Sequence, residues 1–225
     1  MGSIRRAGAP LVYLITDHRA TNGRALPEVV ARALDGLVVG PPRCRPHPPS
    51  SVAVQLRDKD LGGRALFDLG VELRALTSAR GVRLFVNDRV DIALAVGADG
   101  VHLGDGALAV DDVNALAPEI EIALSTHASA QVALAAADPR VSFVVFGPVF
   151  DTPSKRAFGP AQGLSALQAA CGLQIPILAL GGVEPKAVPA CMAAGAAGVA
   201  CVRGILADDD PAKALRAFFG AIEST

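Results

Sequence analysis

The chain has 225 residues and a formal net charge of −1, with 21 Lys and Arg against 22 Asp and Glu. This balance argues against electrostatic binding to nucleic acid or to an anionic membrane surface. Hydrophobic residues make up 51% of the chain and Trp is absent, which favours close packing of helices on a sheet over an aromatic binding surface.

Short apolar runs recur in chain order, and each is followed by a turn and a segment with helical periodicity. The predicted strands span residues 11–16, 52–57, 83–87, 100–103, 121–125, 143–146, 177–180 and 198–202. Strict alternation of strand and helix predicts parallel strands with right-handed crossovers. Eight repeats predict an α/β fold that closes into a (β/α)8 TIM barrel, a single domain over residues 1–225. A doubly wound open sheet is the alternative, but no Gly-x-Gly-x-x-Gly follows the first strand.

One segment interrupts this alternation. Residues 40–51 hold five prolines among twelve residues, which predicts a proline-rich surface insertion between the first helix and the second strand. That connection belongs to the N-terminal face of a barrel, away from the expected chemistry. We therefore expect no catalytic role for Cys44 or His47.

The four cysteines are widely spaced, and none forms a Cys-x-x-Cys pair. We expect them to be reduced thiols, three of them in the core, which points to a cytoplasmic protein. The apolar run near the N-terminus is too short for a secretory signal, and the Ala- and Gly-rich run at 187–202 falls short of a membrane span. A homo-oligomer is compatible with these features.

The carboxyl ends of barrel strands, with the loops that follow them, carry the chemistry of this fold. In the stretch "QLRDKD", Gln55, Arg57 and Lys59 alternate and so would share one face of a strand. Other predicted strand ends add polar residues to the same mouth: Thr16, Asp17, Asn87, Asp88, His102, Ser125, Thr126, His127, Thr152, Ser154 and Lys155. The sequence thus predicts one polar ring.

This ring has the composition of an anion site. Gly181 and Gly182 follow the seventh strand, where backbone N–H groups of this fold often form a phosphate cup. Arg57, Lys59 and Lys155 together carry more positive charge than one phosphate monoester needs, which favours a diphosphate.

Several of these residues also have a purely structural interpretation. Asn87 and Asp88 suit a helix N-cap, the glycine pair suits a tight turn, and His102 and His127 suit packed positions.

The motifs "LVYLITD", "VQLRDKD", "VNDRVDIALAVGADGVHLG", "ALSTHA", "VVFGPVFDTPSK" and "ILALGGV" occur in this order along the chain. This ordered set resembles the thiamine phosphate synthase superfamily, which also contains the thiazole tautomerases. The resemblance extends from the first strand to the eighth. It implies a thiamine-biosynthesis transferase that joins hydroxymethylpyrimidine diphosphate to hydroxyethylthiazole phosphate and releases pyrophosphate. These small phosphorylated molecules would be its partners.

The resemblance also implies roles for individual residues. The residues expected to bind substrate are Gln55, Arg57, Lys59, Asn87, Ser125, Thr152, Ser154, Lys155, Gly181 and Gly182. Of the expected site residues, Arg57, Ser125 and Lys155 would be catalytic. Asp88 would coordinate Mg²⁺. A basic face would then hold the leaving diphosphate while its negative charge develops.

Three departures from the family pattern leave alternatives open. Ala107 stands where the synthases place a second Mg²⁺-binding acid, and we hypothesise that Asp105 completes the metal site from a shifted position. Arg203 stands where a small hydroxyl residue is usual. Pro148 stands where the tautomerases carry a catalytic histidine. A tautomerase-like isomerase and a non-catalytic barrel that binds a phosphorylated thiamine precursor are the alternatives.

Overall fold

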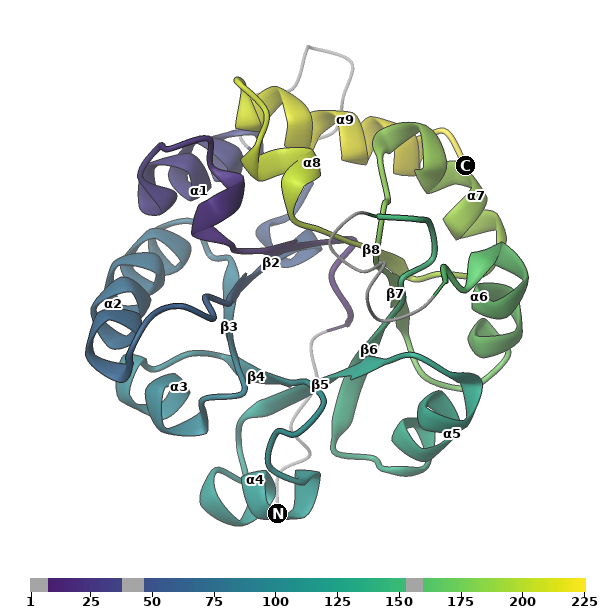
Figure 1. Ribbon diagram of the computed structural model, residues 1–225, viewed down its shortest axis with the longest axis horizontal. Coiled ribbons are helices and arrows are strands. Elements are labelled where there is room, and N and C mark those ends of the chain that lie inside the picture. Colours follow the sequence, from purple (N-terminus) through teal and green to yellow (C-terminus); the bar gives the residue numbers. More distant parts are fainter. Residues whose placement is uncertain (1–7, 38–46, 153–159) are drawn as a thin grey trace.

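The computed structural model describes residues 8–37, 47–152 and 160–225, which form a closed barrel of parallel strands in chain order (Figure 1). The strands are β1 (Val12–Ile15), β2 (Val52–Leu56), β3 (Arg83–Asn87), β4 (Gly100–Leu103), β5 (Glu121–Thr126), β6 (Val141–Phe146), β7 (Ile177–Ala179) and β8 (Gly198–Cys201). Because β1 pairs with β8 as well as with β2, the sheet has no free edge. The (β/α)8 prediction is confirmed, and the open-sheet alternative is wrong.

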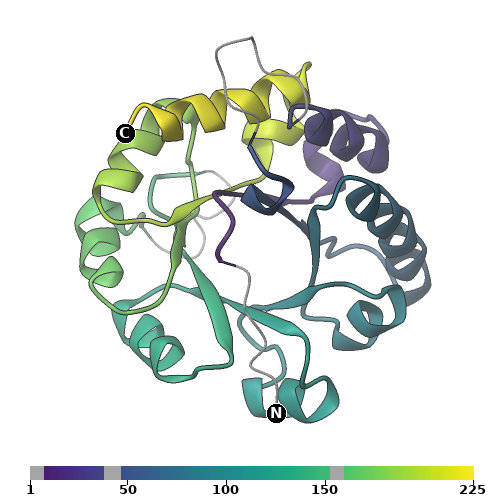
Figure 2. The ribbon, with the colours of Figure 1, turned by 180° about the vertical axis from the view of Figure 1, so that it is seen from behind.

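Helices surround the barrel on all sides (Figure 1). They are α1 (Leu26–Asp35), α2 (Gly63–Ala79), α3 (Val90–Val96), α4 (Val110–Leu116), α5 (Ser129–Ala137), α6 (Gly163–Cys171), α7 (Val188–Ala193), α8 (Arg203–Leu206) and α9 (Pro211–Glu223). The last of them, α9, packs against α1 and α7 and so completes the ring (Figure 2). Within the described residues, no helix combines the length and hydrophobicity that crossing a bilayer requires.

Local sequence explains where these helices begin and end. At the start of α9, Asp210 accepts a hydrogen bond from Lys213 N, and Pro211 occupies the first turn, where its missing N–H costs nothing. At the end of α3, Gly97 adopts a left-handed conformation with φ of 66°, as helix C-caps commonly require. Both signals are readable from the sequence.

Among the described residues, buried side chains fill the barrel interior. Tyr13, Phe85 and Phe143 are fully buried, and their ring centroids lie 5.4–5.7 Å apart in edge-to-face contacts. Gly100 makes this packing possible, because a Cβ atom there would lie 2.2 Å from the Phe85 ring. The aromatic cluster therefore forms a solid floor beneath the carboxyl ends of the strands.

An ion pair closes the amino end of the barrel. Arg83, at the start of β3, donates from Nη1 to Glu121 Oε2 at 2.9 Å and from Nη2 to the carbonyl of Gly8 at 2.8 Å. The Arg83 side chain is 10% exposed and the Glu121 side chain 19% exposed, so this pair is largely shielded from solvent. The predicted site residues that the structure describes lie at the opposite end of the barrel, where the strands end.

The described part of the proline-rich segment packs onto the barrel. His47 stacks on Phe219 of α9 with ring centroids 3.8 Å apart, and its Nε2 lies 3.1 Å from Glu223 Oε1. Ser51 ends the short 3-10 helix Pro49–Ser51 and accepts a hydrogen bond from Leu11 N beside β1. The rest of the predicted insertion, with Cys44, lies outside the described residues.

The three cysteines that the structure describes are free thiols, as predicted. Cys191 and Cys201 are buried and Cys171 is partly buried. Burial raises the pKa of the Cys201 thiol to about 12 and that of the Cys191 thiol to about 11. These thiols are therefore protonated and unreactive at neutral pH.

Candidate active site

The end of β2 provides the first group of predicted site residues. Gln55 is buried inside the barrel, Arg57 is half-buried, and Lys59 is exposed. Thr16 fixes the backbone here: its Oγ1 donates to Arg57 O at 3.1 Å and accepts from Arg57 N at 2.9 Å. Because β2 ends at Leu56, the strand itself positions only Gln55. Arg57 follows the strand and is held by Thr16, and Lys59 lies further along the loop.

Gln55 carries an unused hydrogen-bond donor. Its side-chain Nε2 is buried and has no partner among the described residues. The side chain interacts with the phenol of Tyr13. Burial raises the pKa of this phenol well above its usual range. A buried amide left unpaired costs about 1–3 kcal/mol, so its position in the mouth suits an acceptor brought by a ligand.

A hydrogen-bonded chain crosses the top of the aromatic floor. His102 Nε2 lies 2.9 Å from Ser125 Oγ, and His102 Nδ1 lies 3.5 Å from Tyr13 Oη. Burial, with a smaller contribution from the positive charge of Arg57, lowers the pKa of His102 to about 3. The imidazole is therefore neutral at physiological pH, and it orients the Ser125 hydroxyl in the mouth. The prediction that His102 is a packed histidine is confirmed.

Asp88 is held at the carboxyl end of β3 in a left-handed conformation with φ of 58°. Its Oδ1 accepts from Gly104 N at 2.8 Å, its Oδ2 accepts from Asn87 Nδ2 at 2.7 Å, and its own N–H donates to His102 O at 2.9 Å. The N-cap of α3 is Arg89, and no side chain caps it within the described residues. The N-cap interpretation of Asn87 and Asp88 is therefore wrong. The carboxylate instead joins the ends of β3 and β4 at the mouth.

Asp105 lies in the loop after β4, where it pairs with His127. Its Oδ2 lies 3.4 Å from His127 Nε2, and the Asp105 side chain is 75% exposed. His127 Nδ1 lies 2.6 Å from the carbonyl oxygen of Gly147, so this histidine connects the loops after β4, β5 and β6. A metal-binding role for Asp105 stays a prediction, and it would require this carboxylate to leave His127.

The glycine pair after β7 packs against the segment after β6. A Cβ atom at Gly181 would lie 2.5 Å from Pro148 Cβ, and one at Gly182 would lie 2.8 Å from the carbonyl oxygen of Asp151. Both glycines have positive φ, at 97° and 64°. Phe150 N donates to Gly181 O at 2.9 Å, which joins the two segments. Tight packing alone therefore explains the glycines, and the phosphate cup stays a prediction.

The other residues of interest follow β6 and β8 in sequence. Thr152 directly follows this packed segment, whereas Ser154 and Lys155 lie outside the described residues. Arg203 is exposed at the start of α8, a helix of only four residues. The structure thus brings Gln55, Arg57, Asn87, Asp88 and Ser125 to the mouth around His102.

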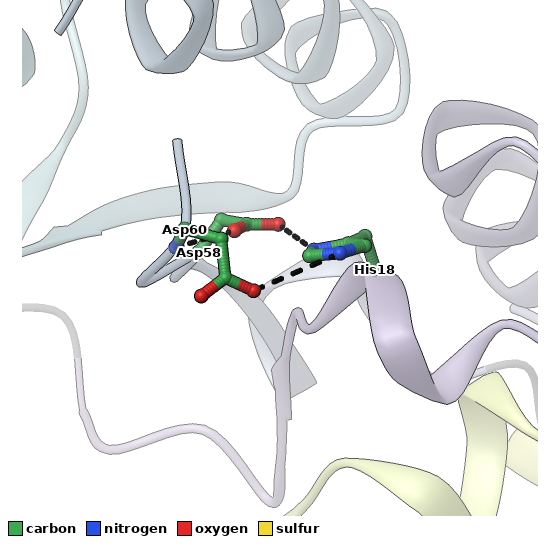
Figure 3. Close-up of side chains that lie close together, drawn as sticks. All are labelled: His18, Asp58 and Asp60. Atoms are coloured by element: carbon green, nitrogen blue, oxygen red, sulfur yellow. Dashed lines mark hydrogen bonds and ion pairs between the residues drawn. The ribbon is translucent and has the colours of Figure 1, made fainter. Parts of the chain in front are cut away.

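Sequence reasoning missed one cluster beside the mouth. His18, Asp58 and Asp60 come together from the loops after β1 and β2 (Figure 3). Asp58 and Asp60 alternate with Arg57 and Lys59 in "RDKD", which was the available signal for a second face. His18 is 40 residues away in sequence from Asp58, and no local pattern predicts that contact.

The closed barrel, its packed aromatic floor and the polar mouth at the carboxyl ends of the strands define a (β/α)8 barrel with its candidate site where this fold carries its chemistry. A family model described as thiamine monophosphate synthase matches residues 12–205. The chain belongs to this thiamine monophosphate synthase family, as its motifs indicate.

Similarity to individual proteins extends over nearly the whole chain. A relative from Geobacter sulfurreducens is 44% identical over 213 residues, which cover 94% of this chain and 93% of that protein. The thiamine-phosphate synthase of Roseiflexus castenholzii is 39% identical, covering 94% of this chain and 87% of its own. The solved structure of thiamine phosphate pyrophosphorylase from Pyrococcus furiosus superimposes with a TM-score of 0.81 at 28% identity and covers 95% of both chains.

Proposed function

We propose that this chain is a thiamine-phosphate synthase, which joins hydroxymethylpyrimidine diphosphate to hydroxyethylthiazole phosphate. In this reaction the bond between the pyrimidine methylene carbon and the diphosphate oxygen breaks, and its electron pair leaves with pyrophosphate. The thiazole nitrogen then donates its lone pair to the methylene carbon and forms the new C–N bond. No proton has to move, so the chemistry does not require a His–carboxylate general base.

One observation carries the proposal: a buried amide with an unpaired donor, a half-buried guanidinium and a carboxylate held by two hydrogen bonds lie at the ends of the neighbouring strands β2 and β3, and β3 pairs with β4, which carries His102. Gln55 interacts with Tyr13, which contacts His102; Arg57 influences the pKa of His102; and Asp88 N donates to His102 O. Gln55 and Arg57 supply donors for an anion, and Asp88 supplies a ligand for a cation bound to that anion.

In the proposed mechanism, Arg57 neutralises charge that develops on the leaving diphosphate. The Gln55 amide donates to a polar atom of the pyrimidine substrate and so satisfies its buried Nε2. Ser125, oriented by His102, lies beside the pyrimidine ring. Lys59 and Lys155, with Asn87, are proposed to hold the diphosphate. Thr152, Ser154, Gly181 and Gly182 are proposed to hold the phosphate groups.

Mg²⁺ is the metal that the family implies, and the donor set around Asp88 fits it in part. In the described part of the chain, one group of three potential metal ligands lies close enough together to share an ion, and Asp88 is not in it. Mg²⁺ is often held by one or two carboxylates together with substrate phosphates and water. Asp88 would hold the ion in this way, with Asp105 as a proposed second ligand, and bound Mg²⁺ would offset the charge of the diphosphate.

The test is turnover of the two substrates by the purified protein with Mg²⁺. We expect one pyrophosphate released per thiamine phosphate formed, measured by a coupled phosphate assay and by thiochrome fluorescence. Isomerisation of a thiazole carboxylate phosphate without pyrophosphate would favour the tautomerase alternative. Tight binding of both substrates by calorimetry without turnover would favour the non-catalytic alternative.

Variants then test the site itself. Asp88→Asn is expected to lower kcat/KM at least about tenfold and to raise the Mg²⁺ concentration needed for half-maximal rate. Asp112→Asn, which removes an exposed carboxylate from α4, is the matched control and should leave both unchanged. Asp105→Ala tests whether Asp105 is the second Mg²⁺ ligand. An unchanged dependence of the rate on Mg²⁺ concentration would exclude Asp105 from the metal site.

A further inference from the structure

The loops after β1 and β2 bring one imidazole and two carboxylates together outside the ring of proposed substrate-binding residues. His18 begins the 3-10 helix His18–Ala20, and its Nδ1 lies 2.6 Å from Asp58 Oδ2. Its Nε2 lies 3.8 Å from Asp60 Oδ2, and Figure 3 shows both carboxylates facing the imidazole ring. One ligand atom from each of the three residues lies within 4.8 Å of the others. Ligands of a first-row divalent ion at about 2.0–2.2 Å span similar distances across its coordination sphere.

The burial of Asp58 distinguishes this cluster from a group of solvated surface charges. The side chain of Asp58 is 1% exposed, whereas His18 is 48% and Asp60 is 41% exposed. Asp58 Oδ1 accepts from Asp60 N at 3.1 Å, which leaves Oδ2 directed at His18. A buried carboxylate is stabilised by a cation or a metal ion, and the half-exposed imidazole leaves a route for an ion to enter.

The charge of the cluster also favours a cation. Asp58 and Asp60 contribute two negative charges, and the guanidinium of Arg19, which pairs with Asp60, contributes one positive charge. With His18 neutral, the group carries a formal charge of −1. An ion that binds here would displace Arg19 from Asp60. It would also replace the direct contact between His18 and Asp58, because both side chains would then bind the ion.

The two loops are fixed relative to each other before any ion binds. The hydrogen bonds between Thr16 and the backbone of Arg57 join them, and Asp17 accepts from Arg19 N at 3.0 Å to shape the turn that presents His18. Little conformational entropy would therefore be lost on binding.

We propose that His18, Asp58 and Asp60 bind one divalent transition-metal ion, with Zn²⁺ as the representative, at a site separate from Asp88. One imidazole nitrogen with two carboxylate oxygens suits Zn²⁺ or a neighbouring first-row ion better than Mg²⁺ or Ca²⁺, which prefer all-oxygen ligands. Because Asp58 lies between Arg57 and Lys59 in sequence, the bound ion would hold the loop that presents both cations to the mouth.

The test is equilibrium dialysis of the full chain against Zn²⁺ in buffer with excess Mg²⁺, which occupies magnesium sites. We expect one Zn²⁺ per chain for the wild type. His18→Gln and Asp60→Asn should each weaken binding at least about tenfold, because each removes one of three ligands. Both side chains are partly exposed, and circular dichroism checks that the variants fold.

Three further variants separate this site from others. Asp88→Asn should retain Zn²⁺ binding, since Asp88 belongs to the proposed magnesium site. His47→Gln removes the histidine that pairs with Glu223 and should also retain it. Arg19→Gln should tighten binding severalfold, because it removes the cation that competes for Asp60; a merely structural ion pair would not produce this gain. Absence of stoichiometric binding to the wild type, or binding that survives His18→Gln and is lost in Asp88→Asn, overturns the proposal.

Discussion

His102 is a buried group whose titration should couple to folding in the acidic range. Its pKa is lowered from 6.5 to about 3 by burial, so between these values the unfolded chain binds a proton that the folded chain does not. Stability therefore rises with pH across this window, is fully present above 6.5, and is lost as pH falls. Each pH unit below 6.5 costs about 1.4 kcal/mol, so near pH 5 this histidine alone lowers the free energy of unfolding by about 2 kcal/mol relative to pH 7.

The variant His102→Gln removes this titration and retains a side chain able to form hydrogen bonds. We expect the gain in unfolding free energy between about pH 5 and pH 7 to be about 2 kcal/mol smaller in the variant than in the wild type. Urea denaturation followed by circular dichroism and by tyrosine fluorescence measures it, provided that both probes give one transition. An identical pH dependence in wild type and His102→Gln would refute the buried neutral imidazole.

Three further variants test parts of the structure that surround the mouth. Ser125→Ala leaves His102 Nε2 without its hydrogen-bond partner. The variant should lower the unfolding free energy by about 1–2 kcal/mol and kcat/KM by about tenfold. Unchanged values in both assays would contradict the hydrogen-bonded chain. Gly181→Ala introduces a Cβ atom 2.5 Å from Pro148 at a φ of 97°, and should lower the melting temperature by about 5 °C in calorimetry. Glu121→Gln removes the negative charge that pairs with the largely buried guanidinium of Arg83 at the start of β3. It should lower the free energy of unfolding by about 2 kcal/mol in urea denaturation and leave kcat/KM unchanged.

The sequence predicts the barrel well because its evidence is local. Apolar runs, turn residues and helical periodicity repeat eight times, and each observed strand lies within two residues of its predicted bounds. The strand β2, for example, ends at Leu56, one residue before the prediction. That single residue matters, because Arg57 then lies just beyond the strand, where hydrogen bonds with Thr16 hold its backbone.

The site could be predicted only in outline. Which strand ends carry polar residues follows from the fold, and the structure brings Gln55, Arg57, Asp88 and Ser125 to the mouth as expected. Which side chains pair across the loops does not follow from it. The contact of His127 with Asp105 and the contact of His18 with Asp58 join residues 22 and 40 positions apart. Such contacts depend on loop geometry that no periodic pattern encodes.

The aromatic plug of Tyr13, Phe85 and Phe143 has a kinetic consequence. These side chains block the barrel below the site, so both substrates enter and both products leave through the opening at the carboxyl ends of the strands. The substrate that binds deeper must bind first, and the product that occupies the deeper part of the site must leave last. Steady-state kinetics should then show a compulsory order of addition and release, with the later product to leave acting as a competitive inhibitor of the first reactant.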